Sequence, residues 1–497
     1  MLGRPRRGAG RSTSMRTALE GGDVIAYHDG GHRILPRGTL VLEDDRVLFV
    51  GRSFPGPVDR RVDVTGRLVI PGLINLHCHA DTEAGGRLIA DVGRRDYFQT
   101  GFLNYFAAPA GVDPLPAREN RRIGATFALV EMLRGGCTTV VEIGPASDEL
   151  VPIVGALGLR AYLSPAFNSA SYRLTPQGQL YYEWDEEAGR RGLERAVAFV
   201  RTYHGAHEGR LRGMLFPYQV DTCSPELLRA TRKAADELGV GIEIHAGQNL
   251  LEFHEILRRY ARTPVEFLDD VGLLGPRTIL GHCIISTAHR LAALPAGRDL
   301  EILARTGTSV AHCPLVFARR GNALESFHRY RAAGVNVGLG TDTYPRDLIS
   351  EMRWASLVCK IVEHDFTVAT AADVFTAATL GGARALGRDD LGRLAPGAKA
   401  DVVVVDLRKL RVGPYRDPIK ALVNCATADD VEHVFVDGRL VVEHGRVVGV
   451  DEARVLREAQ AEAERLWATV QEWHWQGWTA DQLSPLSFPR LDRDLGG

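Results

Sequence analysis

The middle of the chain repeats one unit, a short strand-like run followed by a helix-like segment. The runs are rich in Val, Ile and Leu, and the segments at 123–136 and 225–239 have helical periodicity and end in glycine. This alternation is typical of βαβ units, whose strands are parallel. The strand candidates are 68–77, 138–144, 159–165, 211–220, 240–246, 277–283, 308–314 and 335–342. Eight parallel strands with crossover helices predict an α/β fold, a (β/α)8 barrel over residues 71–395.

Both flanks of the barrel segment have a different texture. Residues 15–70 and 396–450 contain short β-branched runs broken by Gly and Asp, such as GTLVLEDDRVLFVG and KADVVVVDL. Runs of this kind predict antiparallel strands. We therefore expect a small β-sandwich domain assembled from both chain ends. Residues 1–14 are expected to be a disordered basic tail, and residues 451–497 a C-terminal helix and tail.

Charge and composition exclude several classes of partner. Lys and Arg number 60 and Asp and Glu 62, so the net charge is −2, and no basic footprint for nucleic acid or anionic membranes is expected. No apolar run reaches the ~20 residues that a membrane helix needs. The seven cysteines form no CxxC pair, which favours a reducing cytoplasm over a disulfide framework. Cys78 and Cys283 adjoin histidines but are expected to pack in the core.

Two histidines separated by one residue follow the first strand candidate. His77 and His79 can point to the same side because alternate residues of a strand share a face. Taken alone, this pair also fits a surface loop.

Three more polar residues stand at the ends of later strand candidates. His245 ends the fifth, His282 the sixth and Asp342 the eighth. Barrel enzymes place their chemistry at the C-terminal ends of the strands, where the βα-loops converge. The combination with His77 and His79 therefore predicts a metal site.

These segments resemble the amidohydrolase superfamily, in the branch that holds triazine hydrolases, cytosine- and adenosine-type deaminases, and phenylurea and molinate hydrolases. The resemblance lies in PGLINLHCH, EIHAG, LGHC, GLGTD and GRLAPGAKADVVVVDL, which span about residues 20–450. It implies that His77, His79, His245 and Asp342 bind the metal. The predicted fourth strand lacks the lysine that bridges two metals in some members, so one ion is expected.

The resemblance and the ligand chemistry together predict the mechanism. Three imidazoles and a carboxylate suit Zn²⁺, with Co²⁺, Fe²⁺ or Mn²⁺ as alternatives. The ion would activate water. Asp342 is expected to act as general base and His282 to stabilise the charge that develops on the substrate.

Two departures from the family pattern bear on the reaction type. Deaminases of this branch usually carry a glutamate three residues after the fifth-strand histidine, whereas this chain has Gln248. His312 and its following Cys-Pro are not followed by the Ser-Asn of many such deaminases. Both departures favour hydrolysis of a non-peptide amide, urea or (thio)carbamate, with Gln248 orienting water or substrate. The alternative is an aminohydrolase acting on a triazine, pyrimidine or purine.

Substrate contacts are predicted from two segments. An insertion after His79 contains several aromatic residues, including Phe98 and Phe102, which form either a lid over the substrate or a small core of their own. Tyr218 and Gln219 stand near the end of the fourth strand candidate and are expected to face the site, as is His312. The expected partners are a small-molecule substrate and further copies of the chain in a homo-oligomer, with no nucleic acid and no membrane.

Overall fold

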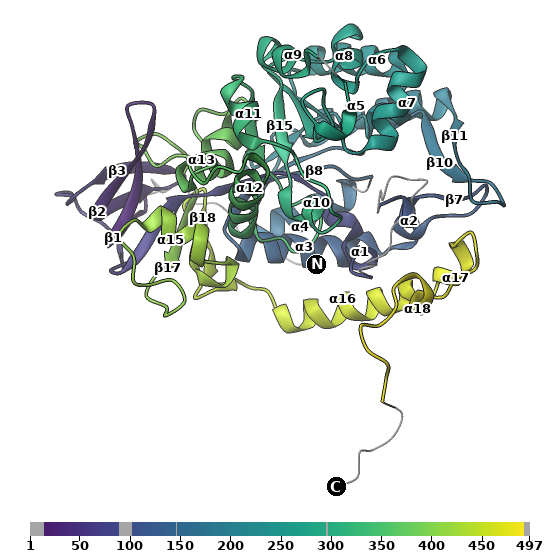
Figure 1. The fold of residues 1–497 in the computed structure, drawn as a ribbon. Helices are drawn as coiled ribbons and strands as arrows, with labels where there is room; N and C mark the ends of the chain where they lie inside the picture. The colour runs from purple at the N-terminus through teal and green to yellow at the C-terminus, as the bar shows by residue number, and fades with distance from the viewer. Residues whose placement is uncertain (1–13, 89–101, 146, 295–296, 492–497) are drawn as a thin grey trace.

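A computed structural model describes residues 14–88, 102–145, 147–294 and 297–491 of the chain, and Figure 1 shows the fold. Each of the eight strand candidates overlaps a strand of its central ring. These strands are β6 (Leu73–Cys78), β8 (Cys137–Glu142), β9 (Arg160–Leu163), β12 (Leu211–Gly213), β13 (Ile242–Ala246), β14 (Thr278–His282), β15 (Ser309–His312) and β16 (Asn336–Leu339).

The ring is built from two four-stranded parallel sheets. One has the order β12-β9-β8-β6 and the other β13-β14-β15-β16. A bridge between Leu215 and Ile242 joins the sheets on one side, and a bridge between Cys78 and Asp342 joins them on the other. The fold is therefore of the TIM-barrel type, as the alternation of strands and helices predicted.

Helices follow the strands of the ring, and their ends match the sequence signals. Segments 123–136 and 225–239 form α3 and α6. In α6, the Ser224 hydroxyl accepts from the backbone N–H of Leu227, and Gly239 ends the helix at φ +69°. The helices from α3 to α15 are α3 (Arg121–Arg134), α4 (Ser147–Leu157), α5 (Glu186–Tyr203), α6 (Pro225–Leu238), α7 (Leu250–Tyr260), α8 (Pro264–Asp270), α9 (Asp299–Thr306), α10 (Pro314–Ala318), α11 (Phe327–Ala332), α12 (Leu348–Glu363), α13 (Ala371–Thr376), α14 (Gly382–Ala385) and α15 (Pro418–Cys425).

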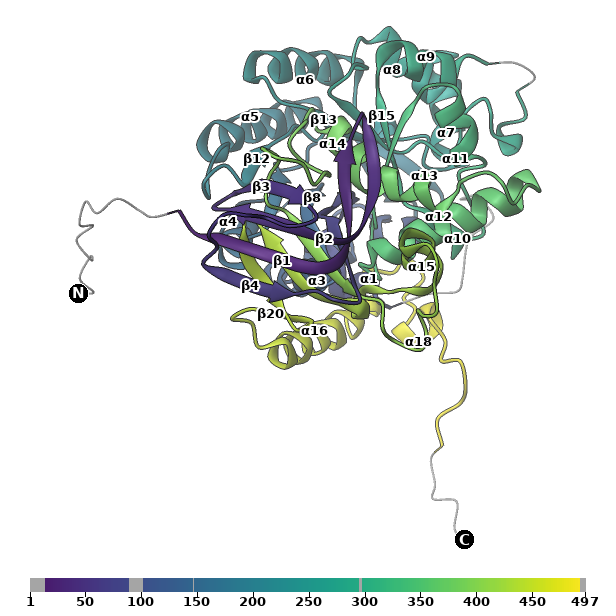
Figure 2. The same cartoon turned by 90° about the vertical axis from the view of Figure 1, so that its left-hand side faces the viewer.

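Strands from both chain ends form one nine-stranded sheet beside the barrel (Figure 2). Its strands are β1 (Arg16–His28), β2 (Gly31–Glu43), β3 (Arg46–Gly51), β4 (Arg60–Asp63), β5 (Arg67–Pro71), β17 (Val402–Asp406), β18 (Val431–Val436), β19 (Arg439–Glu443) and β20 (Arg446–Val447). The two ends meet where β5 pairs antiparallel with β17. The sequence predicted two packed sheets, whereas the pairing makes a single sheet. Register shifts in β1 bend it, and Leu19, Leu40 and Val402 lie in its small core.

The first strand candidate, 68–77, is wrong as one strand. It divides at Gly72 into β5 of the outer sheet and β6 of the barrel. Gly72 packs so closely on β8 that a Cβ there would lie 2.0 Å from Thr138 Oγ1. The chain can change sheets at this point only because no side chain is present.

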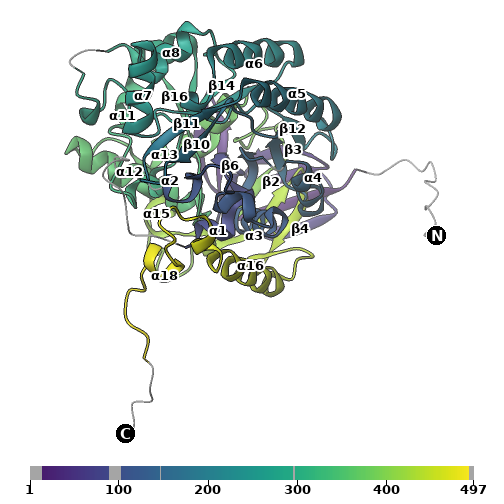
Figure 3. The same ribbon diagram turned by 90° about the vertical axis from the view of Figure 1, so that its right-hand side faces the viewer.

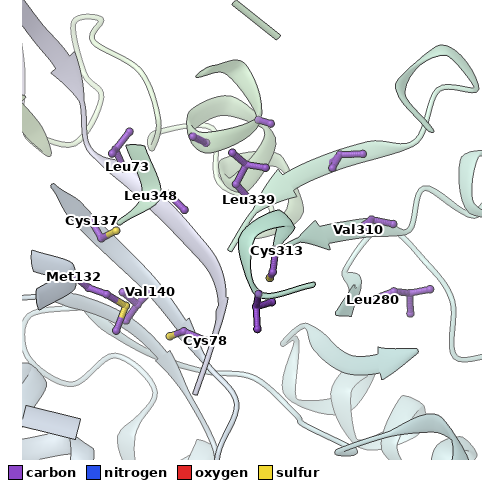
Figure 4. Close-up of a cluster of buried hydrophobic side chains, with 14 of the residues drawn as sticks. Leu73, Cys78, Met132, Cys137, Val140, Leu280, Val310, Cys313, Leu339 and Leu348 are labelled. Atoms are coloured by element: carbon purple, nitrogen blue, oxygen red, sulfur yellow. The ribbon is translucent and has the colours of Figure 1, made fainter. Parts of the chain in front are cut away.

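The cysteines pack in the hydrophobic core, as expected for Cys78 and Cys283. All seven are free and only Cys425 is partly exposed. Figure 4 shows Cys78, Cys137 and Cys313 among leucine and valine side chains that come from different strands. Cys78, Cys283 and Cys313, which adjoin candidate histidines, are therefore packing residues.

Two additions lie outside the ring of barrel strands, a small sheet and the C-terminal segment (Figure 3). A small sheet of β7 (Ala108–Pro109), β10 (Ala170–Leu174) and β11 (Leu180–Trp184) lies near α2 (Leu103–Phe106). The C-terminal segment, predicted as one helix, divides into α16 (Glu452–Trp467), α17 (Val470–Trp473) and α18 (Ala480–Leu483), and α16 packs on α1 (Glu83–Gly86) and α3. In the described part of the chain, none of the helices has the length and apolar character needed to cross a membrane.

Candidate metal centre and active site

The predicted ligands come together at the C-terminal ends of the barrel strands. His77 lies in β6, His79 directly follows that strand, and His245 lies in β13. His282 is the last residue of β14, and Asp342 follows β16. All five side chains are buried or nearly so, with His77 and His282 fully inaccessible.

Each of the first three imidazoles is held through its Nδ1 atom. Nδ1 of His77 lies 2.6 Å from Glu243 Oε1, that of His79 lies 2.7 Å from the Ile143 carbonyl oxygen, and that of His245 lies 2.5 Å from the Tyr218 carbonyl oxygen. These acceptors fix the proton on Nδ1 and leave the Nε2 lone pair free. The free atoms face one another, because Nε2 of His79 and Nε2 of His245 are 3.1 Å apart.

Asp342 completes the cluster from the opposite side of the barrel seam. Its Oδ1 lies 3.8 Å from His77 Nε2 and 3.5 Å from His79 Nε2, and its Oδ2 lies 4.0 Å from His282 Nε2. Two triads of possible ligand atoms share His77, one with His79 and His245 and one with His282 and Asp342. One point is thus surrounded by imidazole nitrogens and a carboxylate.

Burial and mutual proximity keep most of these imidazoles neutral. Burial and the neighbouring His77 hold the pKa values of His79, His245 and His282 well below the ordinary value. For His77 burial also acts to lower the pKa, but the charge and hydrogen bond of Glu243 outweigh it, and the net pKa is raised. Neutral imidazoles are the form that binds metals.

The donor set fits a divalent first-row ion. Nε2 of His77 is fully buried and has no hydrogen-bond partner in the described structure, and leaving a buried polar atom unpaired is costly. A Zn²⁺ ion bound by imidazole nitrogens and a carboxylate would satisfy this atom, and the outer hydrogen bonds on Nδ1 are typical of such sites.

The backbone at two site residues is strained. His282 has φ +75° and Asp342 has φ +57°, in a region that non-glycine residues rarely adopt. Such conformations cost of order 1–3 kcal/mol and persist where surrounding contacts enforce them. The barrel therefore holds these side chains in orientations that the local sequence does not favour.

His282 has the clearest unmet bonding capacity. Neither ring nitrogen has a partner in the described structure, although the residue is fully buried. Its ring packs edge-on against Phe317 at 4.6 Å and against His77 at 4.6 Å between centroids. A ligand or water in the site would supply the missing hydrogen bonds.

Gln248 lies in the loop after β13, three residues beyond His245. The residue is buried and its Oε1 has no partner among the described residues. Its backbone N–H donates to Glu252 Oε2 at 3.1 Å, as does that of Gly247 to Oε1 at 2.5 Å. Burial and the carboxylate of Asp221 hold the pKa of Glu252 well above its usual range. The loop is thus fixed by Glu252, while the Gln248 amide oxygen stays available.

Only some of the residues predicted to contact the substrate lie beside the histidine cluster. Tyr218 lies against the cluster, with ring centroids 5.0 Å from His245 and 6.2 Å from His79. The Gln219 amide instead donates to Glu252 at 3.3 Å. Phe102 packs in a small core with Tyr172 and Leu103, and Phe98 lies outside the described residues.

An aromatic row connects this small core to the metal cluster. Phe102 lies 5.9 Å from Tyr172 and 5.9 Å from Phe106, and Phe106 lies 6.4 Å from Tyr218 between ring centroids. The insertion therefore packs its own core and also reaches the site through Phe106. His312 is buried near Phe327, with centroids 6.3 Å apart, and burial lowers its pKa to about 3.

Two residues at the site, Glu243 and Arg346, were not predicted from the sequence. Glu243, which holds His77, alternates with His245 in β13, so its shared face was a usable signal. Arg346 gave no signal, because a loop arginine after a strand ordinarily faces solvent. In the structure its guanidinium is fully buried and donates to the backbone carbonyl oxygens of His79 and Asp342.

Comparison with known proteins agrees with the geometry. The sequence profile described as "Amidohydrolase family" matches residues 68–441. A 5'-deoxyadenosine deaminase of Methanosarcina mazei is 33% identical over 441 residues, covering 88% of this chain and 95% of the relative. A 5-methylthioadenosine/S-adenosylhomocysteine deaminase of Desulfitobacterium hafniense is 31% identical over 442 residues, covering 87% and 95%.

Solved structures share the fold. An adenosine deaminase from Xanthomonas campestris with bound zinc superposes with a TM-score of 0.76 at 23% identity, covering 91% of this chain and 98% of that one. A mutant atrazine chlorohydrolase from Arthrobacter aurescens, complexed with zinc and atraton, gives 0.75 at 24% identity and covers 90% and 100%.

Proposed function

Because this chain belongs to the amidohydrolase family, we propose that it is a zinc-dependent aminohydrolase that releases an amino group from a nitrogen heterocycle of the adenine-nucleoside class. The relatives support this reaction, since those named above are deaminases of such compounds and align with almost the whole barrel. They favour the alternative over the hydrolysis of an amide, urea or carbamate, which the sequence had placed first.

The proposed metal ligands are His77, His79, His245 and Asp342. Support comes from the three Nδ1 anchors and the unpaired Nε2 of His77. A divalent ion bound there would lower the pKa of a water molecule and so supply the nucleophile at neutral pH.

The chain's own residues would orient the ring and move protons. Asp342 would accept the proton of the attacking water, and His282 would donate to or accept from the group that bears the developing charge. The Gln248 amide would hydrogen-bond a ring nitrogen without titrating. Burial of Gln248 and His282 supports these roles, because hydrogen bonds are stronger where water is excluded.

The substrate ring would stack near Tyr218 and Phe106. Their place in the aromatic row beside His245 supports this position, while Phe102 would support Phe106 from behind. His312 would stabilise the barrel rather than touch the substrate, because it packs toward Phe327. The homo-oligomer, the cytoplasmic location and the division of the chain into a barrel, a composite β domain and terminal segments stay predictions.

A substrate panel on zinc-loaded protein tests the proposal. The panel contains 5'-deoxyadenosine, methylthioadenosine, an aminated triazine and an N-aryl urea, with ammonia or amine release measured and products identified by mass. Release of ammonia from the adenine compounds is expected, and Asp342→Asn serves as the control that lacks the base. Turnover of the aryl urea alone would overturn the proposal.

A further inference from the structure

A fully buried arginine joins the backbones of two predicted metal ligands. Arg346 lies in the loop between β16 and α12, four residues after Asp342. Its Nη1 donates to the Asp342 carbonyl oxygen at 2.6 Å, and its Nη2 donates to the His79 carbonyl oxygen at 2.6 Å. One guanidinium thus bonds residues that are far apart in the sequence.

The guanidinium crosses the seam where the last barrel strand meets the first. At this seam the backbone N–H of His79 donates to the carbonyl oxygen of Asp342 at 2.8 Å. The backbone N–H of Asp342 donates to the carbonyl oxygen of His77 at 3.0 Å. The strained φ of +57° at Asp342 needs surrounding contacts to persist. Arg346 supplies one of them, at the Asp342 carbonyl oxygen, and the same rigid, planar group also bonds the His79 carbonyl oxygen.

Glu83 balances the buried charge and orients the fork. Its carboxylate, also buried, accepts from Arg346 Nε at 2.9 Å and from Nη2. Arg87 pairs with Glu83 and with Glu131, whose Oε1 accepts from the Arg346 backbone N–H at 3.2 Å. Burying an ion pair is costly unless its hydrogen bonds are complete, and here each guanidinium nitrogen has an acceptor.

We propose that Arg346 is a positioning residue for the metal centre, which fixes His79 and Asp342 relative to each other so that their side chains meet the ion without rearrangement. This inference rests on the proposed ligand set. Lysine at this position would keep the charge but would lack the fork, since an ammonium is a single point charge on a flexible chain.

A second buried arginine provides a matched control. Arg160 is as inaccessible as Arg346, and its guanidinium bonds Asp401 at 3.1 Å and Asp437 at 2.6 Å. These contacts join the barrel strand β9 to the outer sheet. Arg160→Lys therefore perturbs a buried ion pair of similar kind at a place away from the ligands.

The test measures metal release from the zinc-loaded protein to a chromogenic chelator. We expect Arg346→Lys to release zinc 10–100-fold faster than the unsubstituted protein, the range for loss of outer hydrogen bonds around a metal site. In the Co²⁺-substituted protein the visible absorption bands should shift. Arg160→Lys should lower the unfolding temperature but keep the release rate and the bands. Zinc release and Co²⁺ bands unchanged in Arg346→Lys would overturn the inference.

Two further measurements distinguish a failure of the positioning role from a failure of the proposed ligand set. Glu83→Gln leaves Arg346 in place but weakens its orientation, so release should be several-fold faster; if Arg346→Lys does not fold, an unchanged rate in Glu83→Gln overturns the inference. If the unsubstituted protein binds no zinc, or if His77→Ala binds it equally well, the ligand set itself is wrong. Failure of the positioning role and failure of the metal centre are therefore distinguishable.

Discussion

Replacing Gln248 by glutamate separates the two reaction types. Deamination of a ring gains from a group that protonates a ring nitrogen, and general acid help is worth roughly 10²–10⁴-fold. The lower value corresponds to about 2.7 kcal/mol of barrier. An amide cannot supply it, so a deaminase with Gln248 works without this contribution.

The surroundings of residue 248 determine whether the new carboxyl group keeps its proton. Gln248 is 7% exposed, and its backbone N–H bonds Glu252. Burial disfavours the charged form of a carboxyl group and so raises its pKa. We therefore expect the new glutamate to keep its proton up to near-neutral pH, where a general acid is effective.

The expected result for Gln248→Glu is a roughly 10–100-fold rise in kcat on adenine-type substrates near pH 6.5. The gain should fade as the pH rises through the pKa of the new group, because only its protonated form donates. Asn249→Asp is the control, since it adds the same charge one residue away, where Asn249 caps α7. Stopped assays of ammonia release at about ten pH values, from about pH 5.5 to about pH 8.5, would record the pH profiles of both variants.

A loss of activity on the enzyme's preferred substrate in Gln248→Glu, with Asn249→Asp unchanged, would refute the reasoning. That result is expected of an enzyme that hydrolyses an amide, urea or carbamate. In such an enzyme the added negative charge would oppose the oxyanion that develops on the carbonyl.

Three further predictions follow from individual side chains. His282→Ala should keep its metal content but lose roughly 10²–10³-fold in turnover; loss of zinc by elemental analysis would make it a ligand instead. His312 has its pKa lowered to about 3 by burial, so the unfolded state binds an extra proton as the pH falls below ~6.5 and the free energy of unfolding decreases. His312→Phe should make that decrease smaller when urea unfolding is compared at about pH 4.5 and about pH 7.5 in buffers of equal ionic strength. An equally steep decrease in the variant would point to other groups. The Trp475 ring covers Gly178 in the β10–β11 turn and packs against the same small core as Phe102, so Trp475→Ala should raise KM several-fold with kcat nearly constant, and a fall in kcat alone would contradict this.

The residue pattern alone was enough for the parts of the fold that depend on local periodicity. Each strand of the barrel overlaps a predicted run, because parallel strands buried on both faces are near-continuous apolar segments. The ends of α3 and α6 followed their glycines, since glycine readily adopts the left-handed conformation that ends a helix. His77, His79, His245, His282 and Asp342 could be grouped because all follow or end such strands, and strand ends share one face of a barrel.

Contacts between distant segments decided the rest. Periodicity cannot show that 68–77 changes sheets at Gly72, because that depends on the space beside Thr138. It cannot place Gln219 against Glu252 rather than toward the site, because both orientations suit the same residue type. It also cannot predict that Arg346 is buried. The sequence determined which residues bring chemistry to the barrel mouth, whereas only the tertiary structure, by closing the ring between β6 and β16, decided which of them are held there and by what.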